Sequence, residues 1–433
     1  MILTDAHKQA LREMEAQRFN EARAILEPLT EAGGPWIIAN DLALCRSMTG
    51  DPESGLALLD GVLSREPANG FARVNRFYVA EAAKVRSAPP PDPRSKIRDT
   101  LGQGPSRALI SVVMPTFNRP DLIKESIASV LAQTMAEWEL IVVNDGGGRE
   151  VEHTMREYLT DPRVRYVYAD HGGLSSARNA GMALGKGEYI TQLDDDDVFY
   201  PDHLATVATA FRGRPEVKVV YTDFYRAIQE KRGDEWVTVK RAVDYSHEFS
   251  REIFRYSTIA PVCNLTHHRE ALETVGFYNE HILRAMDWDY FTRLSRRYDF
   301  LHVKKVTGEF REKSDRSQMT RSFAIPRNYY RNLVSFLHGF FPLTGARFAD
   351  GTSGSGDALQ RALEGLMTRG RDDLFMRRLE LRKLISEPYY AMFYTLGKRL
   401  SEEGLRPEAR AAFRAALRLR PYEIKILARW IKP

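Results

Sequence analysis

The sequence predicts an α/β fold with a mostly parallel sheet and helices on both of its faces, flanked by all-helical segments at both ends of the 433-residue chain. Between residues 108 and 322, short apolar runs alternate with stretches of helical period, which is typical of a doubly wound sheet. Residues 4–86 and the region from 323 onward have only the helical period. Residues 87–107 are rich in proline, glycine and charge and are predicted to be a linker. The predicted domains are therefore 1–86, 108–322 and 323–433, with that linker after the first.

Two stretches of the N-terminal segment, 20–26 and 52–58, resemble each other at an offset of 32 residues (52 minus 20). Each places small and aliphatic side chains on one helix face, which resembles tetratricopeptide repeats of about 34 residues. Residues 390–432 space glycine, proline and alanine in a similar way. The alternative for the N-terminal segment is a short helical bundle without repeats.

The central domain is expected to run through alternating strands and helices. Short runs of four to six residues that are mostly apolar predict buried strands, and apolar residues that recur every three or four positions predict helices. The predicted strands are 109–114, 140–143, 164–168, 189–193 and 217–221, and the predicted helices between them are 121–131 and 174–184.

Composition narrows the class of protein. Hydrophobic residues make up 43% of the chain and no run of about 18 apolar residues occurs, so we expect no membrane-spanning helix. The N-terminus lacks the apolar core of a signal peptide, and the only cysteines, Cys45 and Cys263, lie in different predicted domains. We therefore expect a cytoplasmic protein without disulfides. The net charge of +5 is small and no nucleic-acid-binding motif accompanies it, so we expect no nucleic-acid partner.

Four consecutive aspartates, Asp194 to Asp197, follow the predicted strand at 189–193. Adjacent carboxylates repel one another and have poor strand propensity, so their place at the end of an inner strand indicates a bound cation. Carboxylate oxygens suit Mg²⁺ or Mn²⁺, ions that also bridge substrate phosphates. Open α/β sheets bind ligands at the carboxyl ends of their strands. The alternative is an acidic surface loop.

Two further segments follow predicted strands. Asp145 ends the strand at 140–143 and precedes three glycines, which permit close approach of a ligand to the backbone. Residues 115–119, Pro-Thr-Phe-Asn-Arg, follow the first strand, where backbone N–H groups and an arginine lie within reach of phosphate. Each signal alone is weak, and a simple turn is the alternative for Asp145.

In their order and spacing, these segments resemble the family-two glycosyltransferases of GT-A fold, over roughly residues 108–320. The motifs that carry the resemblance are SVVMPTFNR at 111–119, VNDGG at 143–147, SARNAG at 176–181, GEYITQLDDDD at 187–197, VGF at 275–277 and DWD at 287–289.

The resemblance implies a role for each matching residue. Asp194 and Asp196 would bind the Mn²⁺ or Mg²⁺ ion, and Asp287 would be the general base. The nucleotide would be bound by Pro115, Thr116, Asp145, Arg178, Asn179 and Asp195. The acceptor would contact Met286 and Trp288, although core packing is the alternative for the tryptophan.

The sequence departs from the family pattern at two positions. Met286 stands where relatives carry the glutamate of a Glu-Asp pair, which puts the acceptor contacts in doubt. The loop that carries a histidine in many relatives has none here, and Arg311 or Lys313 is within reach of its role.

The activity implied is inverting, metal-dependent transfer of a sugar from a nucleoside-diphosphate donor, with a UDP-sugar as the first candidate. The acceptor would be a hydroxyl of a glycan, a lipid-linked glycan or a protein, as in cell-surface polysaccharide biosynthesis. The metal would offset the charge that builds on the leaving diphosphate, and Asp287 would take the acceptor proton. One alternative is a non-catalytic helical-repeat interaction protein with a relic α/β domain. Another is a nucleotidyltransferase, which would need a glycine-rich loop where residues 115–119 contain no glycine.

The helical ends are expected to bind a partner. Arg410, Arg414 and Arg418 recur every four residues and therefore share one helix face. Such a face suits peripheral contact with an anionic membrane, while the apolar face suits a homo-oligomer. A solvated face that only covers the core is the alternative.

Overall fold

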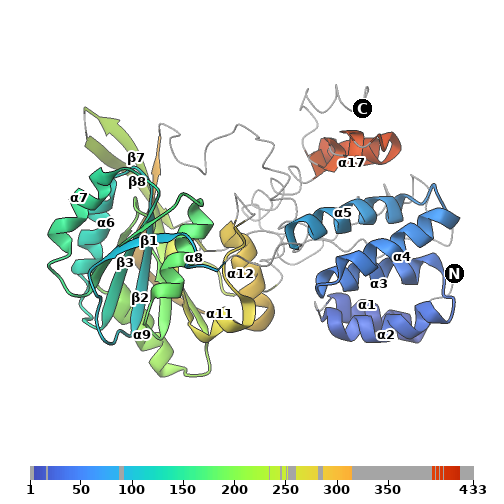
Figure 1. The fold of residues 1–433 in the computed structure, drawn as a ribbon, viewed down its shortest axis with the longest axis horizontal. Helices are drawn as coiled ribbons and strands as arrows, with labels where there is room; N and C mark the ends of the chain where they lie inside the picture. The colour runs from blue at the N-terminus through green and yellow to red at the C-terminus, as the bar shows by residue number, and fades with distance from the viewer. Residues whose placement is uncertain are drawn as a thin grey trace. The chain divides into compact units, whose positions relative to one another are not determined.

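The computed structural model describes residues 4–15, 18–86, 92–233, 235–243, 246–249, 251, 260–280, 286–314, 393–394, 396–398, 400–402 and 404–419. The chain divides into two compact units (Figure 1). One unit is Met1–Pro89 together with Leu333–Pro433, and the other is Pro90–Asn332. Most of the helical region predicted at 323–433 lies outside the described residues.

The first unit is helical, as predicted for residues 4–86, and from α1 to α5 each helix packs against the next along the chain. The helices are α1 (Asp5–Glu15), α2 (Phe19–Glu31), α3 (Trp36–Met48), α4 (Pro52–Arg65), α5 (Gly70–Arg86) and, near the C-terminus, α17 (Arg406–Leu419). Helix α4 shows why the sequence begins a helix there. Asp51 caps it by accepting a hydrogen bond from the Ser54 N–H at 3.2 Å, and proline occupies the first turn. The resemblance to tetratricopeptide repeats stays a prediction.

None of the helices in the described parts of the chain is long and apolar enough to cross a membrane. Both cysteines are buried and free, as expected for a chain without disulfides.

The second unit is built on a ten-stranded sheet in the order β1-β4-β3-β2-β5-β9-β7-β10-β6, with β8 paired to β7. Neighbouring strands β4, β3, β2 and β5 are all parallel, and β7 pairs in parallel with β10. The remaining pairs are antiparallel. The strands are β1 (Ile97–Leu101), β2 (Ile110–Thr116), β3 (Trp138–Asp145), β4 (Val164–Ala169), β5 (Tyr189–Gln192), β6 (Val198–Phe199), β7 (Val219–Arg232), β8 (Glu235–Val243), β9 (Leu265–His268) and β10 (Phe300–Lys313).

Helices cover both faces of this sheet, which confirms the predicted fold class (Figure 1). Successive side chains of a strand point to opposite faces. In β3, Leu140 and Val142 pack with residues of α6 and α7, whereas Ile141 and Val143 pack with α8. The helices of this unit are α6 (Leu122–Leu131), α7 (Arg149–Tyr158), α8 (Leu174–Leu184), α9 (His203–Gly213), α11 (Glu270–Val275), α12 (Met286–Arg297) and the 3-10 helix η1 (Val262–Asn264).

The linker prediction is wrong for part of residues 87–107, because β1 lies within them and pairs antiparallel with β4. Strand β1 reads IRDTL, and its three central residues are exposed. An edge strand of this kind buries too little apolar surface to produce the continuous apolar run by which the inner strands were recognised.

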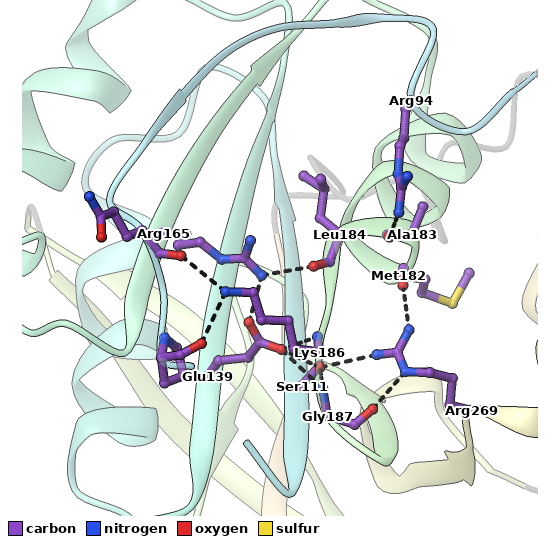
Figure 2. Close-up of polar contacts among 12 residues, drawn as sticks. Arg94, Ser111, Glu139, Arg165, Met182, Ala183, Leu184, Lys186, Gly187 and Arg269 are labelled. Atoms are coloured by element: carbon purple, nitrogen blue, oxygen red, sulfur yellow. Dashed lines mark hydrogen bonds and ion pairs between the residues drawn. The ribbon is translucent and has the colours of Figure 1, made fainter. Parts of the chain in front are cut away.

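A buried carboxylate, Glu139, fastens the connection between α8 and β5 at the amino end of the sheet (Figure 2). Its Oε1 accepts hydrogen bonds from Ser111 Oγ at 2.7 Å, from the Gly187 N–H at 3.1 Å and from the Lys186 N–H. Its Oε2 pairs with Arg165 Nη2 at 2.5 Å. Since β5 begins directly after this connection, the cluster fixes where the strand starts and hence where its acidic end lies.

Candidate active site

The carboxyl ends of the parallel strands β2, β3 and β5 border a cavity of about 300 Å³. The loops after β2, β4 and β5 supply its walls, together with the start of α8 and Phe310 of β10. The predicted site residues that line it are Pro115, Thr116, Asp145, Asp194, Asp195 and Asp196. Six of the residues that the sequence indicated for the site therefore lie around one cavity, and their roles stay predictions.

Asp195 is buried against the loop that follows β2. It accepts hydrogen bonds from Thr116 Oγ1 at 2.8 Å and from Arg119 Nη1 at 2.9 Å. Arg119 also reaches Asp196 Oδ2 at 3.4 Å, so one guanidinium serves two carboxylates. Burial, reinforced by the charge of Asp196, raises the pKa of Asp195 to about 6, while Arg119 opposes the shift. The site thus carries more negative charge than its own cation offsets.

Asp194 points to another cation, Arg178, whose Nη2 lies 2.6 Å from its Oδ1. Arg178 itself is only 2% exposed and does not line the cavity. Its guanidinium lies over the ring of Tyr278, 5.6 Å from the centroid. Arg178 therefore lies beneath the cavity wall, where it holds Asp194, and its predicted role at the nucleotide stays a prediction.

Asn179 also lies away from the cavity lining, because its side chain holds the backbone of Tyr278. Its Nδ2 donates to the Tyr278 carbonyl at 2.9 Å, and its Oδ1 accepts from the Tyr278 N–H at 2.8 Å. Of the α8 residues in the SARNAG motif, Ala177 faces the cavity instead. Neighbouring positions of a helix point in different directions, and the motif alone does not indicate which of them reaches the ligand.

The fourth aspartate, Asp197, turns into the protein interior. Its Oδ1 accepts a hydrogen bond from the Arg311 N–H at 2.8 Å, and the buried thiol of Cys263 lies beside it. Burial, together with the charges of Asp196 and Asp194, raises the pKa of Asp197. The four consecutive carboxylates therefore diverge, and only the first three line the cavity.

Asp145 both lines the cavity and shapes the loop after β4. Its Oδ1 accepts from the Gly172 N–H at 2.7 Å, and its Oδ2 accepts from the Gly173 N–H at 2.9 Å. His171 Nδ1 lies 2.9 Å from the same Oδ2. Gly146 has a φ of 75°, and a Cβ there would lie 2.7 Å from the backbone nitrogen of His171, so this turn requires glycine.

An aromatic pair that the sequence did not indicate lies at the cavity. Phe117 is 44% exposed, and its ring centroid is 4.8 Å from that of His171, with the planes tilted by 32°. Both residues line the cavity. Phe117 belongs to a recognised motif, but nothing in a sequence distinguishes an exposed phenylalanine from a buried one.

The three acceptor-side residues lie at the start of α12. Met286 and Trp288 are buried, with exposures of 6% and 7%, and Asp287 is partly exposed. Burial raises the pKa of Asp287, and the charge of Arg178 lowers it. Asp287 is thus close enough to Arg178 to respond to its charge, although it is not part of the cavity lining.

The two residues considered as substitutes for the histidine lie outside the cavity lining. Arg311 pairs with Glu125, and Lys313 is buried with its ammonium over the ring of Trp236, 5.2 Å from the centroid. Their neighbour Phe310 lines the cavity instead.

The donor set fits a divalent cation that is completed by substrate. Within the described ranges, no three His, Cys, Asp or Glu side chains gather into a group that could hold a metal by themselves. Mg²⁺ is usually held by one or two carboxylates together with phosphate and water oxygens, so Asp194 and Asp196 suffice on the protein side.

The family model for glycosyl transferase family 2 matches residues 111–276. This part of the chain is a family-two glycosyltransferase domain. The resemblance drawn from the sequence motifs is thereby confirmed over those residues. Asp287 lies beyond the matched range, so its role as general base stays a prediction.

Curated relatives share this domain but differ in length. Chondroitin synthase from Pasteurella multocida (strain Pm70) is 32% identical over 199 residues, which is 46% of this chain and 20% of the relative. Chondroitin synthase from Escherichia coli is 30% identical over 203 residues, or 28% of its length. An uncharacterized glycosyltransferase of Bacillus subtilis (strain 168), YwdF, is 25% identical over 244 residues and is 88% covered. The chain thus spans less than a third of the two synthases.

Solved structures give remote likenesses. The TarS 1–349 fragment from S. aureus, in complex with UDP, has a TM-score of 0.44 and 16% identity, covering 72% of this chain and 88% of that one. The mannosyltransferase PcManGT from Pyrobaculum calidifontis, in complex with GDP-Man and Mn²⁺, has a TM-score of 0.39 and 18% identity, covering 83% and 86%.

Proposed function

We propose that this chain is an inverting, metal-dependent glycosyltransferase that moves a sugar from a nucleoside-diphosphate donor to an acceptor hydroxyl. The observation that carries the proposal is the gathering of Asp145, Asp194, Asp195 and Asp196 around one cavity of the family-two domain. Carboxylates at two strand ends, those of β3 and β5, suit a metal-bound diphosphate and a nucleoside, and a relic domain has no reason to keep them gathered around a cavity.

The donor nucleotide is proposed to bind in the cavity, with UDP as the first candidate. The Phe117–His171 pair offers an aromatic surface for the base, and Asp145 lies beside it as a hydrogen-bond acceptor. Pro115 and Thr116 form the wall between the base and the carboxylates. Arg119 lies at the acidic end, where it is placed to contact the diphosphate once a metal binds the carboxylates.

Asp194 and Asp196 would hold Mn²⁺ or Mg²⁺, which when bound offsets the charge that develops on the diphosphate. Asp287 accepts the proton of the attacking hydroxyl, from the side of the sugar opposite the leaving group. Partial burial raises the pKa of Asp287 and makes it a stronger base than a fully exposed aspartate, while Arg178 favours its ionised form.

The acceptor is proposed to be a glycan, a lipid-linked glycan or a protein hydroxyl. It would approach Asp287 at the start of α12, next to Met286 and Trp288. We place the reaction in the cytoplasm, with peripheral membrane contact or self-association through the helical segments. The two free, buried thiols accord with a reducing compartment.

A screen of nucleotide sugars, each with and without Mn²⁺, tests the proposal. We expect metal-dependent release of the nucleoside diphosphate from one donor, accelerated by the correct acceptor. Formation of a nucleotide sugar from a nucleoside triphosphate would instead identify a nucleotidyltransferase. Absence of both nucleotide binding and turnover across the whole screen would favour the non-catalytic interaction protein.

A further inference from the structure

Lys96 lies outside the matched family domain, on the segment that enters β1, yet it reaches the active-site region. Its Nζ donates to Glu280 Oε2 at 3.0 Å and to Ser176 Oγ at 3.2 Å. Strand β1 fixes its backbone, since the Lys96 carbonyl accepts from the Asp170 N–H at 2.8 Å. The segment before β1 therefore places a lysine beside Ser176 and Glu280, and this lysine lies outside the matched residues 111–276.

The partner of Lys96, Glu280, belongs to a tightly held stretch of chain. Its side chain is only 9% exposed, and its Oε1 accepts from Asn179 Nδ2 at 3.1 Å. Asn179 also bonds both backbone groups of Tyr278. The Tyr278 hydroxyl accepts a further bond from Gln192 Nε2 at 2.9 Å, at the end of β5.

This stretch packs directly on α12, the helix that begins with Met286 and Asp287. The rings of Tyr278 and Tyr290 stack with centroids 4.4 Å apart and planes 20° apart. Arg293 of α12 donates through Nη2 to the Phe277 carbonyl at 2.9 Å. A displacement of Glu280 should therefore shift α12, the helix that carries the proposed base, through these contacts.

The other side of Lys96 borders the nucleotide cavity. A Cβ built on Gly172 would lie 2.5 Å from its Nζ, so the ammonium rests against the glycine backbone. Gly172 belongs to the loop that Asp145 holds, and its neighbours His171 and Gly173 line the cavity. Lys96 thus contacts both a cavity wall and the stretch that packs on α12.

We infer that Lys96 is a positioning residue for sugar transfer: its ion pair with Glu280 fixes the Asp287 helix relative to the nucleotide cavity. This inference rests on the proposed function. Misplacement of a catalytic group by about 1 Å can lower a rate about 100-fold, so loss of one tie should lower turnover measurably. Nucleotide affinity should not change, because Lys96 does not line the cavity.

The test compares Lys96→Met, Glu280→Gln and the charge swap Lys96→Glu with Glu280→Lys. Lys96→Arg keeps the cation, and Arg98→Met is the matched control, since Arg98 lies two residues further on in β1 and pairs with the exposed Asp170. Three quantities are measured in the full chain: kcat for transfer, the Kd of the nucleoside diphosphate with Mn²⁺, and amide hydrogen exchange of a peptide spanning 278–290.

We expect Lys96→Met and Glu280→Gln to lower kcat roughly 10-fold, to leave Kd within about twofold, and to speed exchange in 278–290. Lys96→Arg and the charge swap should recover most of both effects, and Arg98→Met should show neither. Unchanged exchange and kcat in Lys96→Met, or an equal change in Arg98→Met, would overturn the inference. So would a loss of nucleotide affinity as large as the loss of kcat, which would make Lys96 a donor-binding residue.

Exchange needs no turnover, which separates this inference from the proposed function. If the wild-type chain transfers no sugar but Lys96→Met alone speeds exchange in 278–290, the positioning role of the Lys96–Glu280 ion pair is supported and the proposed function fails. If the wild-type chain transfers sugar and Lys96→Met leaves exchange unchanged, the proposed function is supported and the positioning role of the Lys96–Glu280 ion pair is not.

Discussion

Arg178 Nη2 lies 2.6 Å from Asp194 Oδ1, and the same buried guanidinium lowers the pKa of Asp287 against the effect of burial. One buried cation therefore acts on a proposed metal ligand and on the proposed base. The two carboxylates belong to different elements, since Asp194 follows β5 and Asp287 begins α12. Arg178 therefore interacts with both carboxylates although it does not itself line the cavity.

Replacing Arg178 by glutamine should shift the pH dependence of transfer. Asp287 must be ionised to accept a proton, and without the cation its pKa rises further above its ordinary value. The acidic limb of kcat/KM should therefore move to higher pH, with the largest activity loss at the acidic end. Arg178→Lys, which keeps the charge, should move it less. An unshifted limb in Arg178→Gln would mean that the guanidinium does not set the charge of Asp287.

Asp287→Asn should retain donor binding and lose turnover. An amide cannot accept the hydroxyl proton, and general-base catalysis contributes roughly 10²- to 10⁴-fold. Titration of the nucleoside diphosphate with Mn²⁺ and steady-state transfer separate the two effects. Asp299→Asn, at an exposed carboxylate beyond the end of α12, serves as control. An equal loss of donor affinity would make Asp287 a binding or structural residue.

Asp196→Ala should abolish metal-dependent nucleotide binding while leaving the fold intact. The side chain lines the cavity, and its removal takes away the charge that adds to the effect of burial in raising the pKa of Asp195. Calorimetric titration with Mn²⁺ and nucleotide, alongside thermal unfolding, measures both outcomes. Asp121→Ala, at an exposed carboxylate, is the control. Full activity in excess chelator would remove the metal from the mechanism.

Glu139→Gln should destabilise the protein without touching the cavity. Glu139 is fully buried and pairs with Arg165, whose side chain is 7% exposed, so the change leaves a buried guanidinium without its counter-charge. Breaking such a pair costs about 3–5 kcal/mol, which denaturant titration resolves. The exposed neighbour Glu137→Gln should change the free energy of unfolding by less than about 0.5 kcal/mol. If Glu139→Gln changed the free energy of unfolding as little as Glu137→Gln, the hydrogen bonds of residue 139 would hold the connection without its charge.

The exposed arginine face of α17 should bind anionic lipid. Arg406, Arg410, Arg414 and Arg418 are exposed along this helix, and each such residue near a membrane contributes about 1 kcal/mol. Replacing Arg410, Arg414 and Arg418 by glutamate should abolish flotation with phosphatidylserine vesicles at low salt. Vesicles of neutral lipid and high salt are the controls. Equal flotation of wild type and the triple variant would make the face a solvated surface, and sedimentation would then test self-association.

The sequence predicted the inner strands and the cavity edge well because both depend on local patterns. Short, mostly apolar runs indicated β2, β3, β4 and β5, and polar residues directly after parallel strands must share one edge. Strand β1 escaped detection because an edge strand with exposed central residues has no apolar run. The N-terminal linker prediction failed there for that reason.

Side-chain directions were beyond a pattern-based prediction. The aspartates at 194–197 look equivalent in sequence, but the turn after β5 sends Asp197 inward to the Arg311 N–H while Asp194 to Asp196 line the cavity. Arg178 and Asn179 were expected at the nucleotide and lie beneath the wall instead, because tertiary contacts with Asp194 and Tyr278 decide their rotamers.

The hydrogen-bonded cluster around Glu139 also limits where the chain can be changed by insertion or deletion. One carboxylate satisfies the backbone of two successive residues, Lys186 and Gly187, just before β5 begins. An extra residue inserted there would either break these hydrogen bonds to Glu139 or shift β5 by one position against β2. Such a shift would exchange the inward-facing and outward-facing side chains of β5. Such a slip would carry the whole acidic run with it. Fluorophores, affinity tags or loop grafts therefore belong elsewhere on the domain, and deletions in this short connection should be as damaging as insertions.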